Sequence, residues 1–211
     1  MILDLTHLIA GGMPVYPGTD SPDLSPAATL KENGCRETML RMTSHTGTHM
    51  DAPAHMLPGG ATLDALPVSR FCGRALVIDC TLLRGPQVTR EVLRPYEREI
   101  ERADFLLLRT GFEALWGTPE YYGDFAVPDR EAMAYLTGRD LKGIGTDAIS
   151  IDLLPETDFS NHMLLFGAGM VSIENLRLAA APEGVLIPFC ALPLHFHDSD
   201  GAPVRAIARL D

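Results

Sequence analysis

Three histidines and one aspartate lie close together in the segment from Ser44 to Pro58, which reads Ser-His-Thr-Gly-Thr-His-Met-Asp-Ala-Pro-Ala-His-Met-Leu-Pro. The four side chains are those of His45, His49, Asp51 and His55. Imidazole and carboxylate groups at this density are typical of sites that bind a divalent metal ion. Structural zinc sites favour cysteine, and this segment contains none. We therefore expect a catalytic or substrate-binding metal site here.

The spacing of these residues favours an extended backbone. Gly47 and Pro53 both argue against a continuous helix through the segment. All four candidate side chains occupy odd-numbered positions, and alternate residues of a strand project to the same face of a sheet. We therefore expect the segment to be extended, with the three imidazoles and the carboxylate on one face.

Length and charge restrict the function classes that remain. The chain has 211 residues, of which 46% are hydrophobic, and no shift in composition marks a linker, so we expect one domain over residues 1–211. The 28 acidic and 17 basic residues give a net charge of -11, which argues against a nucleic-acid backbone or an anionic membrane surface as partner. A small-molecule substrate is the partner that we expect.

Neither the cysteines nor the apolar segments change this interpretation. The four cysteines form no Cys-x-x-Cys pair, so we expect free, buried thiols. The N-terminal residues lack a basic region ahead of an apolar run, and the longest apolar stretches are too short to span a bilayer. These features predict a cytoplasmic protein.

Hydrophobic periodicity predicts a mixed α/β sheet in which several strands follow one another without an intervening helix. A loop rich in proline at 13–22 and a long surface excursion with some helix at 112–127 connect these elements. The helices that we expect span 89–101, with Thr89 as N-cap, and 128–136, with a further helix from Ile173 capped by Ser172. The expected strands are 2–9, 37–42, 74–80, 104–109, 141–146, 185–192 and 204–210.

For several other polar residues the sequence allows both a structural role and a role in a site. Asp147 and Asp152 follow an expected strand, where either turn formation or support of a site is possible. His195 and His197 lie near two aspartates in a weak metal-like cluster, for which a polar hairpin is the favoured interpretation. Tyr16 is held between prolines, where it either walls a pocket or packs on its own loop.

Written as His-x-Gly-Thr-His-x-Asp-x-Pro-x-His, the segment from His45 to His55 resembles the cyclase-like metal-dependent hydrolase family, whose members include bacterial kynurenine formamidase and isatin hydrolase. The Pro-Val-Tyr-Pro-Gly loop at 14–18, the region from 162 to 176 and the C-terminal strands also resemble the family. The resemblance implies a single domain with a mixed β-sheet of the swivelling β/β/α type. It also implies a homodimer or a higher homo-oligomer.

The resemblance also assigns roles to individual residues. His45, His49 and Asp51 would hold one metal ion, and His162 would bind a second, with Asp51 and Glu174 shared between the two. His55 would be the acid/base residue. Tyr16 would line the substrate pocket, at a position where kynurenine formamidases usually carry tryptophan.

This ligand set predicts two divalent ions, with zinc favoured and manganese as a competitor because the carboxylates are hard donors. The predicted reaction is hydrolysis of an amide bond, most simply in an aryl formamide of the N-formylkynurenine type, by metal-activated water with His55 as acid/base. Two alternatives remain, namely a hydrolase of a cyclic amide or lactone such as isatin, and a non-enzymatic protein that binds a metal or metabolite.

Overall fold

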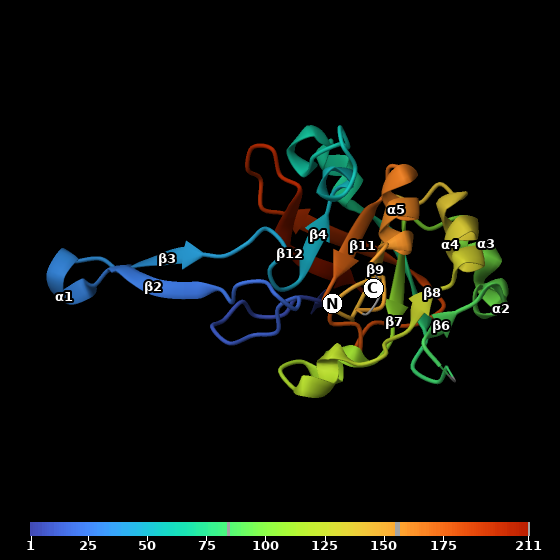
Figure 1. Ribbon diagram of the computed structural model, residues 1–211, viewed down its shortest axis with the longest axis horizontal. Coiled ribbons are helices and arrows are strands. Elements are labelled where there is room, and N and C mark those ends of the chain that lie inside the picture. The colour runs from blue at the N-terminus through green and yellow to red at the C-terminus, as the bar shows by residue number, and fades with distance from the viewer. Residues whose placement is uncertain (84, 155–156, 211) are drawn as a thin grey trace.

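The computed structural model describes residues 1–83, 85–154 and 157–210, and one eight-stranded sheet forms its centre (Figure 1). The strand order is β1-β12-β11-β5-β7-β9-β10-β4, and an additional pairing between β12 and β4 gives the sheet a barrel-like closure. The mixed α/β prediction is confirmed. The strands are β1 (Ile2–Asp4), β4 (His49–Asp51), β5 (Cys72–Asp79), β7 (Phe105–Arg109), β9 (Gly143–Thr146), β10 (Val171–Glu174), β11 (Leu186–Pro193) and β12 (Gly201–Arg209).

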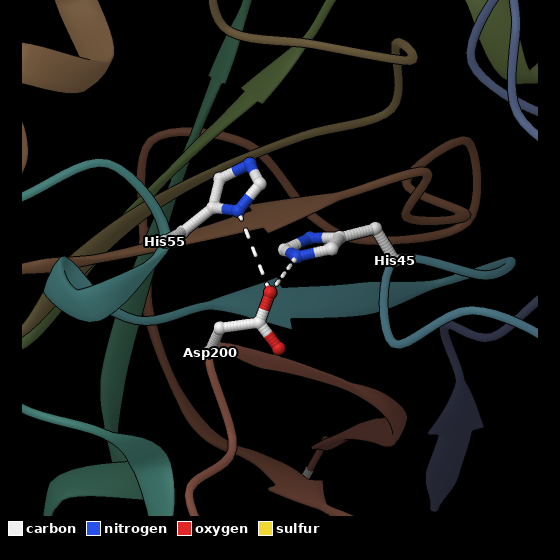
Figure 2. Close-up of side chains that lie close together, drawn as sticks. All are labelled: His45, His55 and Asp200. Atoms are coloured by element: carbon white, nitrogen blue, oxygen red, sulfur yellow. Dashed lines mark hydrogen bonds and ion pairs between the residues drawn. The ribbon is translucent and has the colours of Figure 1, made fainter.

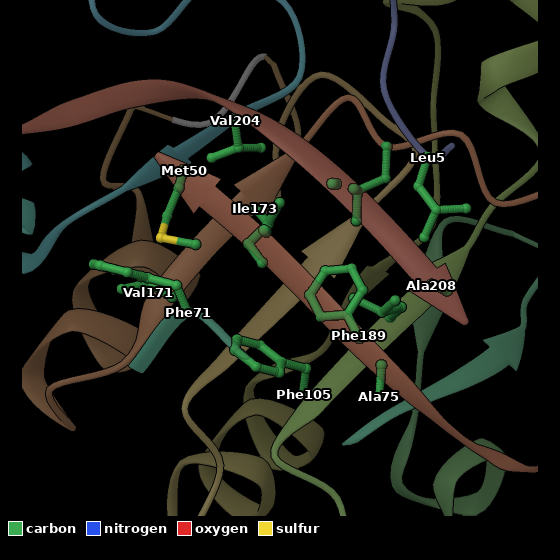
Figure 3. Packing of buried hydrophobic residues seen from close by; sticks show 14 of the residues in the cluster. Leu5, Met50, Phe71, Ala75, Phe105, Val171, Ile173, Phe189, Val204 and Ala208 are labelled. Carbon is green, nitrogen blue, oxygen red and sulfur yellow. The ribbon is translucent and has the colours of Figure 1, made fainter. Parts of the chain in front are cut away.

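The middle of the sheet is parallel, from β5 through β7 and β9 to β10, and its neighbours on both sides are antiparallel. The runs 75–78 in β5 and 105–108 in β7 are buried throughout, as continuous apolar runs in parallel strands require. Alternate residues enter two different cores: Val77 and Phe105 face the interior shown in Figure 3, whereas Ile78 and Leu106 face the helices. The sheet is therefore covered by apolar packing on both faces.

Short helices cover the outer face on the side labelled α2 to α5 in Figure 1. Asp129 caps the helix α4 (Arg130–Thr137), since its carboxylate accepts a hydrogen bond from the Ala132 amide at 2.7 Å. The helix α5 (Ser160–Gly167) carries His162. The predicted helix 89–101 is interrupted by Pro95, which lacks an amide hydrogen. It becomes α2 (Arg90–Leu93), a 3-10 helix η4 (Arg94–Tyr96) and α3 (Glu97–Ile100), and Thr89 makes no side-chain capping bond.

A hairpin arm, defined as residues 23–41, projects from the body of the molecule (Figure 1). It consists of β2 (Asp23–Ala28), the single-turn helix α1 (Leu30–Asn33) and β3 (Glu37–Arg41), and every residue of β3 is exposed. The sequence predicted β3 but not β2 or the projection. β2 was missed because Pro26 interrupts its strand pattern.

Several other boundaries differ from the predictions. The helix expected from Ile173 is wrong, because Ser172 and Ile173 lie in β10 between β9 and β4. The first strand ends at Asp4. The segment 112–127 contains the 3-10 helices η5 (Phe112–Leu115) and η6 (Pro119–Tyr122), and it is not a pure surface excursion, since Tyr121 and Phe125 are fully buried.

Two further short strands, β6 (Gln87–Val88) and β8 (Val127–Pro128), form a separate parallel pair, so Pro128 precedes α4 and does not begin it. Among the described residues, no helix is long and apolar enough to cross a membrane.

Candidate metal centre

The histidine segment folds differently from the single strand that its spacing predicts. Only β4, which carries His49 and Asp51, is a strand, and Gly47 before it adopts the left-handed conformation with a φ of 66°. Pro53 begins the 3-10 helix η1 (Pro53–His55), which ends at His55. The extended prediction is therefore wrong at both ends. Nevertheless, all four predicted side chains line one cavity.

Pairing with β10 brings Glu174 to the histidine segment. In the antiparallel register Glu174 lies opposite His49 and Ser172 opposite Asp51, so the Glu174 side chain reaches the same site from the neighbouring strand. The helix α5 supplies His162, whose Nε2 lies 3.1 Å from Glu174 Oε1 and 3.7 Å from Asp51 Oδ2. The five predicted metal ligands thus meet in space, although 129 positions separate His45 from Glu174.

Among the described residues, three groups of candidate ligand atoms lie close enough to hold a metal ion. The half-buried His45, His55 and Asp200 form one of them, and the five predicted ligands form the other two, which overlap. One consists of His45, His49 and Asp51, and the other of Asp51, His162 and Glu174. In each group the candidate ligand atoms lie within 4.8 Å of one another. Glu174 also approaches the first group, since its Oε2 is 3.6 Å from His49 Nε2. Asp51, common to both groups, is the residue that could bridge two ions.

The charges of the site fit a bound cation. Asp51 and Glu174 are 1% and 5% exposed, and their ion-pair partners in the described part of the chain are histidines rather than lysine or arginine. A buried carboxylate requires a compensating positive charge. Imidazole and carboxylate donors together suit zinc or manganese. The residues present therefore fit the metal that the resemblance implies.

The pKa values of the histidines also show that the buried carboxylates favour positive charge in the site. Burial lowers the pKa of His45, but the carboxylates of Asp51 and Asp200 outweigh burial and raise it to about 9. Burial also opposes the protonation of His49 and His162, and neighbouring carboxylates again raise both pKa values. His45 therefore carries a proton at neutral pH in the metal-free site, and metal binding must displace it.

His49 is held by a chain of buried hydrogen bonds. Its Nδ1 lies 2.8 Å from the carbonyl oxygen of Gly47, to which the side-chain amide of Asn175 also donates at 2.8 Å. Asn175 is fixed in turn, because the hydroxyl of Tyr121 donates to its Oδ1 at 2.6 Å. The ring nitrogen Nε2 of His49 is left facing Asp51 and Glu174.

His162 is held by Asp152, which was one of the two aspartates with open roles. Asp152 Oδ2 lies 2.6 Å from His162 Nδ1, and the same carboxylate accepts hydrogen bonds from the amides of Asn161 and His162 at the start of α5. Asp152 therefore supports the site. Asp147 keeps the turn role, since it accepts hydrogen bonds from Thr110 and from the Gly111 amide.

The hairpin before β12 contributes Asp200, one of the two aspartates of the weak metal-like cluster that includes His195 and His197. Asp200 Oδ2 lies 3.0 Å from His45 Nε2 and 3.7 Å from His55 Nδ1 (Figure 2). His195 and His197 stay outside the site: the His197 side chain is 98% exposed and lies near Asp64. The interpretation as a polar hairpin fits the two histidines but is wrong for Asp200. The signal for Asp200 in the sequence was its place in that weak cluster of histidines and aspartates before a strand.

A cavity of about 430 Å³ opens onto these ligands. Its wall includes Tyr16, as predicted, together with Pro14, Ile149 and Phe159. Burial and the Glu174 carboxylate raise the pKa of the Tyr16 hydroxyl, which therefore stays protonated at neutral pH. A volume of this size lies within the range of small-molecule binding sites.

The sequence and the fold also match known proteins. A family model described as "Putative cyclase" matches residues 3–153. This chain belongs to the cyclase family. A kynurenine formamidase from Salinibacter ruber is 31% identical over 211 residues, which cover 99% of this chain and 97% of that protein.

Two solved structures are similar to this chain over almost its whole length. One, described as a potential metal-dependent hydrolase with cyclase activity, is 30% identical and has a TM-score of 0.79, with 100% of this chain and 99% of that chain covered. Isatin hydrolase A from Labrenzia aggregata, solved with benzyl benzoate, is 26% identical and has a TM-score of 0.85, with 99% and 93% covered. The cyclase fold therefore extends over the full described chain.

Proposed function

We propose that this member of the cyclase family is a metal-dependent hydrolase of an amide bond, with an aryl formamide of the N-formylkynurenine type as the favoured substrate. The observation that carries the proposal is the pair of overlapping ligand groups that open onto one cavity. The relatives named kynurenine formamidase support the substrate class. Their similarity extends over almost the whole of both chains, so the cavity residues are included.

Divalent ions held by His45, His49, Asp51, His162 and Glu174 would supply Lewis acidity and lower the pKa of a water molecule. The residues of the chain itself would transfer the proton and hold the substrate. His55 lines the cavity with its side chain 30% exposed, and it belongs to neither of the two groups that contain Asp51. With His45 and Asp200 it forms a third, half-buried group of candidate ligand atoms. Burial lowers the pKa of its imidazole from the ordinary value, and an imidazole is a group that can both accept and donate a proton.

In this proposal His55 delivers a proton to the nitrogen that departs when the amide bond breaks. An aryl amide nitrogen is a poor leaving group unless it is protonated, so proton delivery at this atom is required. The Tyr16 and Phe159 rings wall the cavity and provide apolar surface for a flat aromatic group. These walls would also limit the access of bulk water to the site.

Ring opening of a cyclic amide such as isatin is the second candidate. Isatin hydrolase A has the higher TM-score of the two solved structures, 0.85 against 0.79, although its identity is lower. The same proton would go to the same kind of nitrogen, so the metal site itself does not separate the two substrates. The residues of the cavity wall must therefore determine which of the two substrates is preferred.

The experiment is a panel of N-formylkynurenine, isatin and simple lactones with the zinc-loaded and manganese-loaded protein. We expect hydrolysis of N-formylkynurenine with the highest kcat/KM, measured by absorbance as the free aniline appears. Faster opening of isatin would favour the second candidate. Tight metal binding without turnover of any panel member would instead support a non-enzymatic binding protein.

We propose two ions per chain, with zinc favoured, on the basis of the shared Asp51 carboxylate. Glu174→Gln tests this number, because a neutral amide is a weaker ligand than the carboxylate that it replaces. We expect the variant to lose one of two ions, as measured by elemental analysis after gel filtration. Unchanged metal content would count against the second site.

We propose a homodimer in which the hairpin arm packs on a second copy. An isolated two-stranded hairpin is marginally stable in water, and Leu24, Leu30, Met39 and Leu40 are all exposed on this one. We expect Met39→Asp to shift the mass measured by light scattering towards the monomer. Leu82→Asp is the control, since Leu82 is 92% exposed outside the arm. An unchanged mass for both variants would contradict the assignment of the arm.

The swivelling β/β/α description and the cytoplasmic location remain predictions from the sequence. Both are compatible with the fold described above, but neither contributes to the assignment of the reaction.

A further inference from the structure

Asp200 occupies the point where the hairpin between β11 and β12 meets the site. Its position is fixed by its backbone, because its carbonyl accepts a hydrogen bond from the Ala52 amide at 2.8 Å. The next residue, Gly201, pairs with Asp51 in the register between β12 and β4. The Asp200 side chain then projects towards His45 and His55, as Figure 2 shows. A side-chain replacement would leave this backbone pairing in place.

The other supporting groups of the site define what such a carboxylate does. The Nδ1 atom of His49 is occupied by the Gly47 carbonyl, and that of His162 by Asp152. In each case a group behind the ring fixes its orientation and leaves the opposite nitrogen facing the site. Asp200 stands in the same relation to His45, at 3.0 Å from Nε2.

Asp200 differs from these groups because the same oxygen also faces His55. Its Oδ2 is 3.7 Å from His55 Nδ1, which is longer than a hydrogen bond but within reach of one after a small rotation of the exposed carboxylate. Hydrogen bonds of this kind often tighten only when substrate binds. A carboxylate oxygen has two lone pairs, so it can accept from both rings.

His55 needs such a partner. It ends the three-residue helix η1, and its ring contacts are with His45, at a centroid distance of 3.9 Å, and with the edge of Phe166 at 6.5 Å. Among the described residues, no hydrogen bond fixes its ring nitrogens. If the His55 ring were free to rotate, the proton that it delivers to the leaving nitrogen would not be held in a fixed position.

We propose that Asp200 is a positioning residue that holds the Nδ1–H of His55 and thereby directs Nε2 of His55 into the cavity. The inference rests on the proposed function, because it gives Asp200 a role in the proton transfer assigned to His55. During turnover the proton moves between His55 Nε2 and the departing nitrogen, and the Nδ1 proton stays with the imidazole. In this role Asp200 contacts neither the substrate nor a metal ion, and because its carboxylate also belongs with His45 and His55 to a group of candidate ligand atoms, the zinc affinity of Asp200→Ala is part of the test.

A double-mutant cycle separates this role from a role through His45. For Asp200→Ala we expect kcat for N-formylkynurenine, or for isatin if that is the better substrate, to fall by about 10- to 100-fold. KM should change less than about threefold, because the cavity wall is untouched. Asp200→Asn keeps one acceptor oxygen and should restore part of the loss. In a His55→Ala background, Asp200→Ala should lower kcat no further.

Two measurements that do not depend on turnover complete the test. Zinc affinity, from competition with a chromophoric chelator, should change less than about threefold in Asp200→Ala. Nitrogen-15 spectra of the imidazoles in the zinc-loaded protein should show His55 protonated at Nδ1 in the wild type and a mixture of tautomers in Asp200→Ala, with the His55 signal identified by its absence in His55→Ala.

The outcomes separate the two hypotheses. A wild-type protein that hydrolyses no panel member would overturn the proposed function, and the nitrogen-15 spectra would still decide the position of the His55 proton. An active wild type with additive losses in the cycle, a parallel loss of zinc, or an unchanged His55 tautomer in Asp200→Ala would overturn the role of Asp200 alone.

Discussion

Two carboxylate–histidine contacts at the candidate metal centre differ in their burial. Asp152 and His162 are 1% and 4% exposed in their side chains, with 2.6 Å between oxygen and nitrogen. Asp200 is 44% exposed and serves His45 at 3.0 Å and His55 at 3.7 Å. We call these the closed side and the open side. The closed side is fixed by its surroundings, whereas the open side has room for substrate and for small rotations.

The difference in burial predicts a difference in energetics. Removing one partner from a buried ion pair leaves an uncompensated polar group and costs about 3–5 kcal/mol, whereas exposed pairs are worth about 0–1 kcal/mol. Changes on the closed side should therefore reduce stability and metal affinity together. Changes on the open side should reduce turnover with little effect on folding.

The largest effect is expected for Asp152→Asn on the closed side. Because Asp152 orients His162 and caps the start of α5, we expect metal affinity to fall by about 10- to 100-fold. The free energy of unfolding should fall by on the order of 3 kcal/mol. Chelator competition and urea unfolding measure the two quantities.

The control for that variant is Asp147→Asn. Asp147 is equally buried and accepts three hydrogen bonds, but from Thr110 and Gly111 rather than from a metal ligand. It should lose stability and keep its metal affinity. If the metal affinity of Asp152→Asn stays within about threefold of the wild type, then Asp152 supports folding but does not support metal binding, and the account of the closed side is wrong.

An intermediate effect is expected for Gly201→Ala on the open side. A Cβ atom at Gly201 would lie 2.4 Å from Cε1 of His45, so the imidazole would have to move. The His45 side chain is 20% exposed and can move outwards, so we expect a stability loss of only about 1 kcal/mol. Metal affinity and turnover should each fall by about tenfold.

Gly167→Ala is the matched control, because an added Cβ there meets nothing within 4 Å. Equal behaviour of the two alanine variants would show that close packing against His45 is unimportant. Both are measured by chelator competition and steady-state kinetics.

The smallest effect concerns His7, a histidine that is partly buried without a carboxylate. It stacks on Trp116 at a centroid distance of 3.9 Å, and its buried Nε2 has no hydrogen-bond partner among the described residues. Burial lowers its pKa to about 4, whereas the carboxylates around His45 raise that pKa to about 9. The contrast shows that the carboxylates, not burial, set the charge of the metal centre.

A histidine with a lowered pKa contributes stability above its unfolded pKa of about 6.5, and that contribution is lost as the pH falls towards 4. Partial exposure screens the effect, so we expect about 1 kcal/mol. Urea unfolding at pH 7 and pH 5 should show a steeper loss in the wild type than in His7→Phe, which keeps the stacking. Parallel losses would mean that His7 does not titrate with folding.

The sequence predicted the chemistry of the site better than its geometry. His45, His49, Asp51 and His55 could be found because three imidazoles and a carboxylate cluster within eleven positions. The prediction that all four lie on one strand was wrong, because the left-handed Gly47 and the turn at Pro53 change the direction of the chain. The resemblance to the family, rather than any local pattern, identified His162 and Glu174.

The roles that the sequence left open depend on contacts between distant segments. Asp152 and Asp200 are ordinary loop aspartates until α5 and the β12–β4 pairing bring them to the histidines. The core strands β5 and β7 were predicted because an apolar run of four buried residues is a local signal. Ile173 was assigned to a helix because a short apolar segment fits either structure until its neighbouring strands are known.

The central claim is that His55 transfers a proton and is not a metal ligand. The most direct measurement is the metal content and the turnover of His55→Ala in the same preparation, by elemental analysis and steady-state kinetics. We predict that metal content stays at the wild-type value while kcat falls by about 10²- to 10⁴-fold. Loss of metal in parallel with activity, in a protein that remains folded by circular dichroism, would contradict the account.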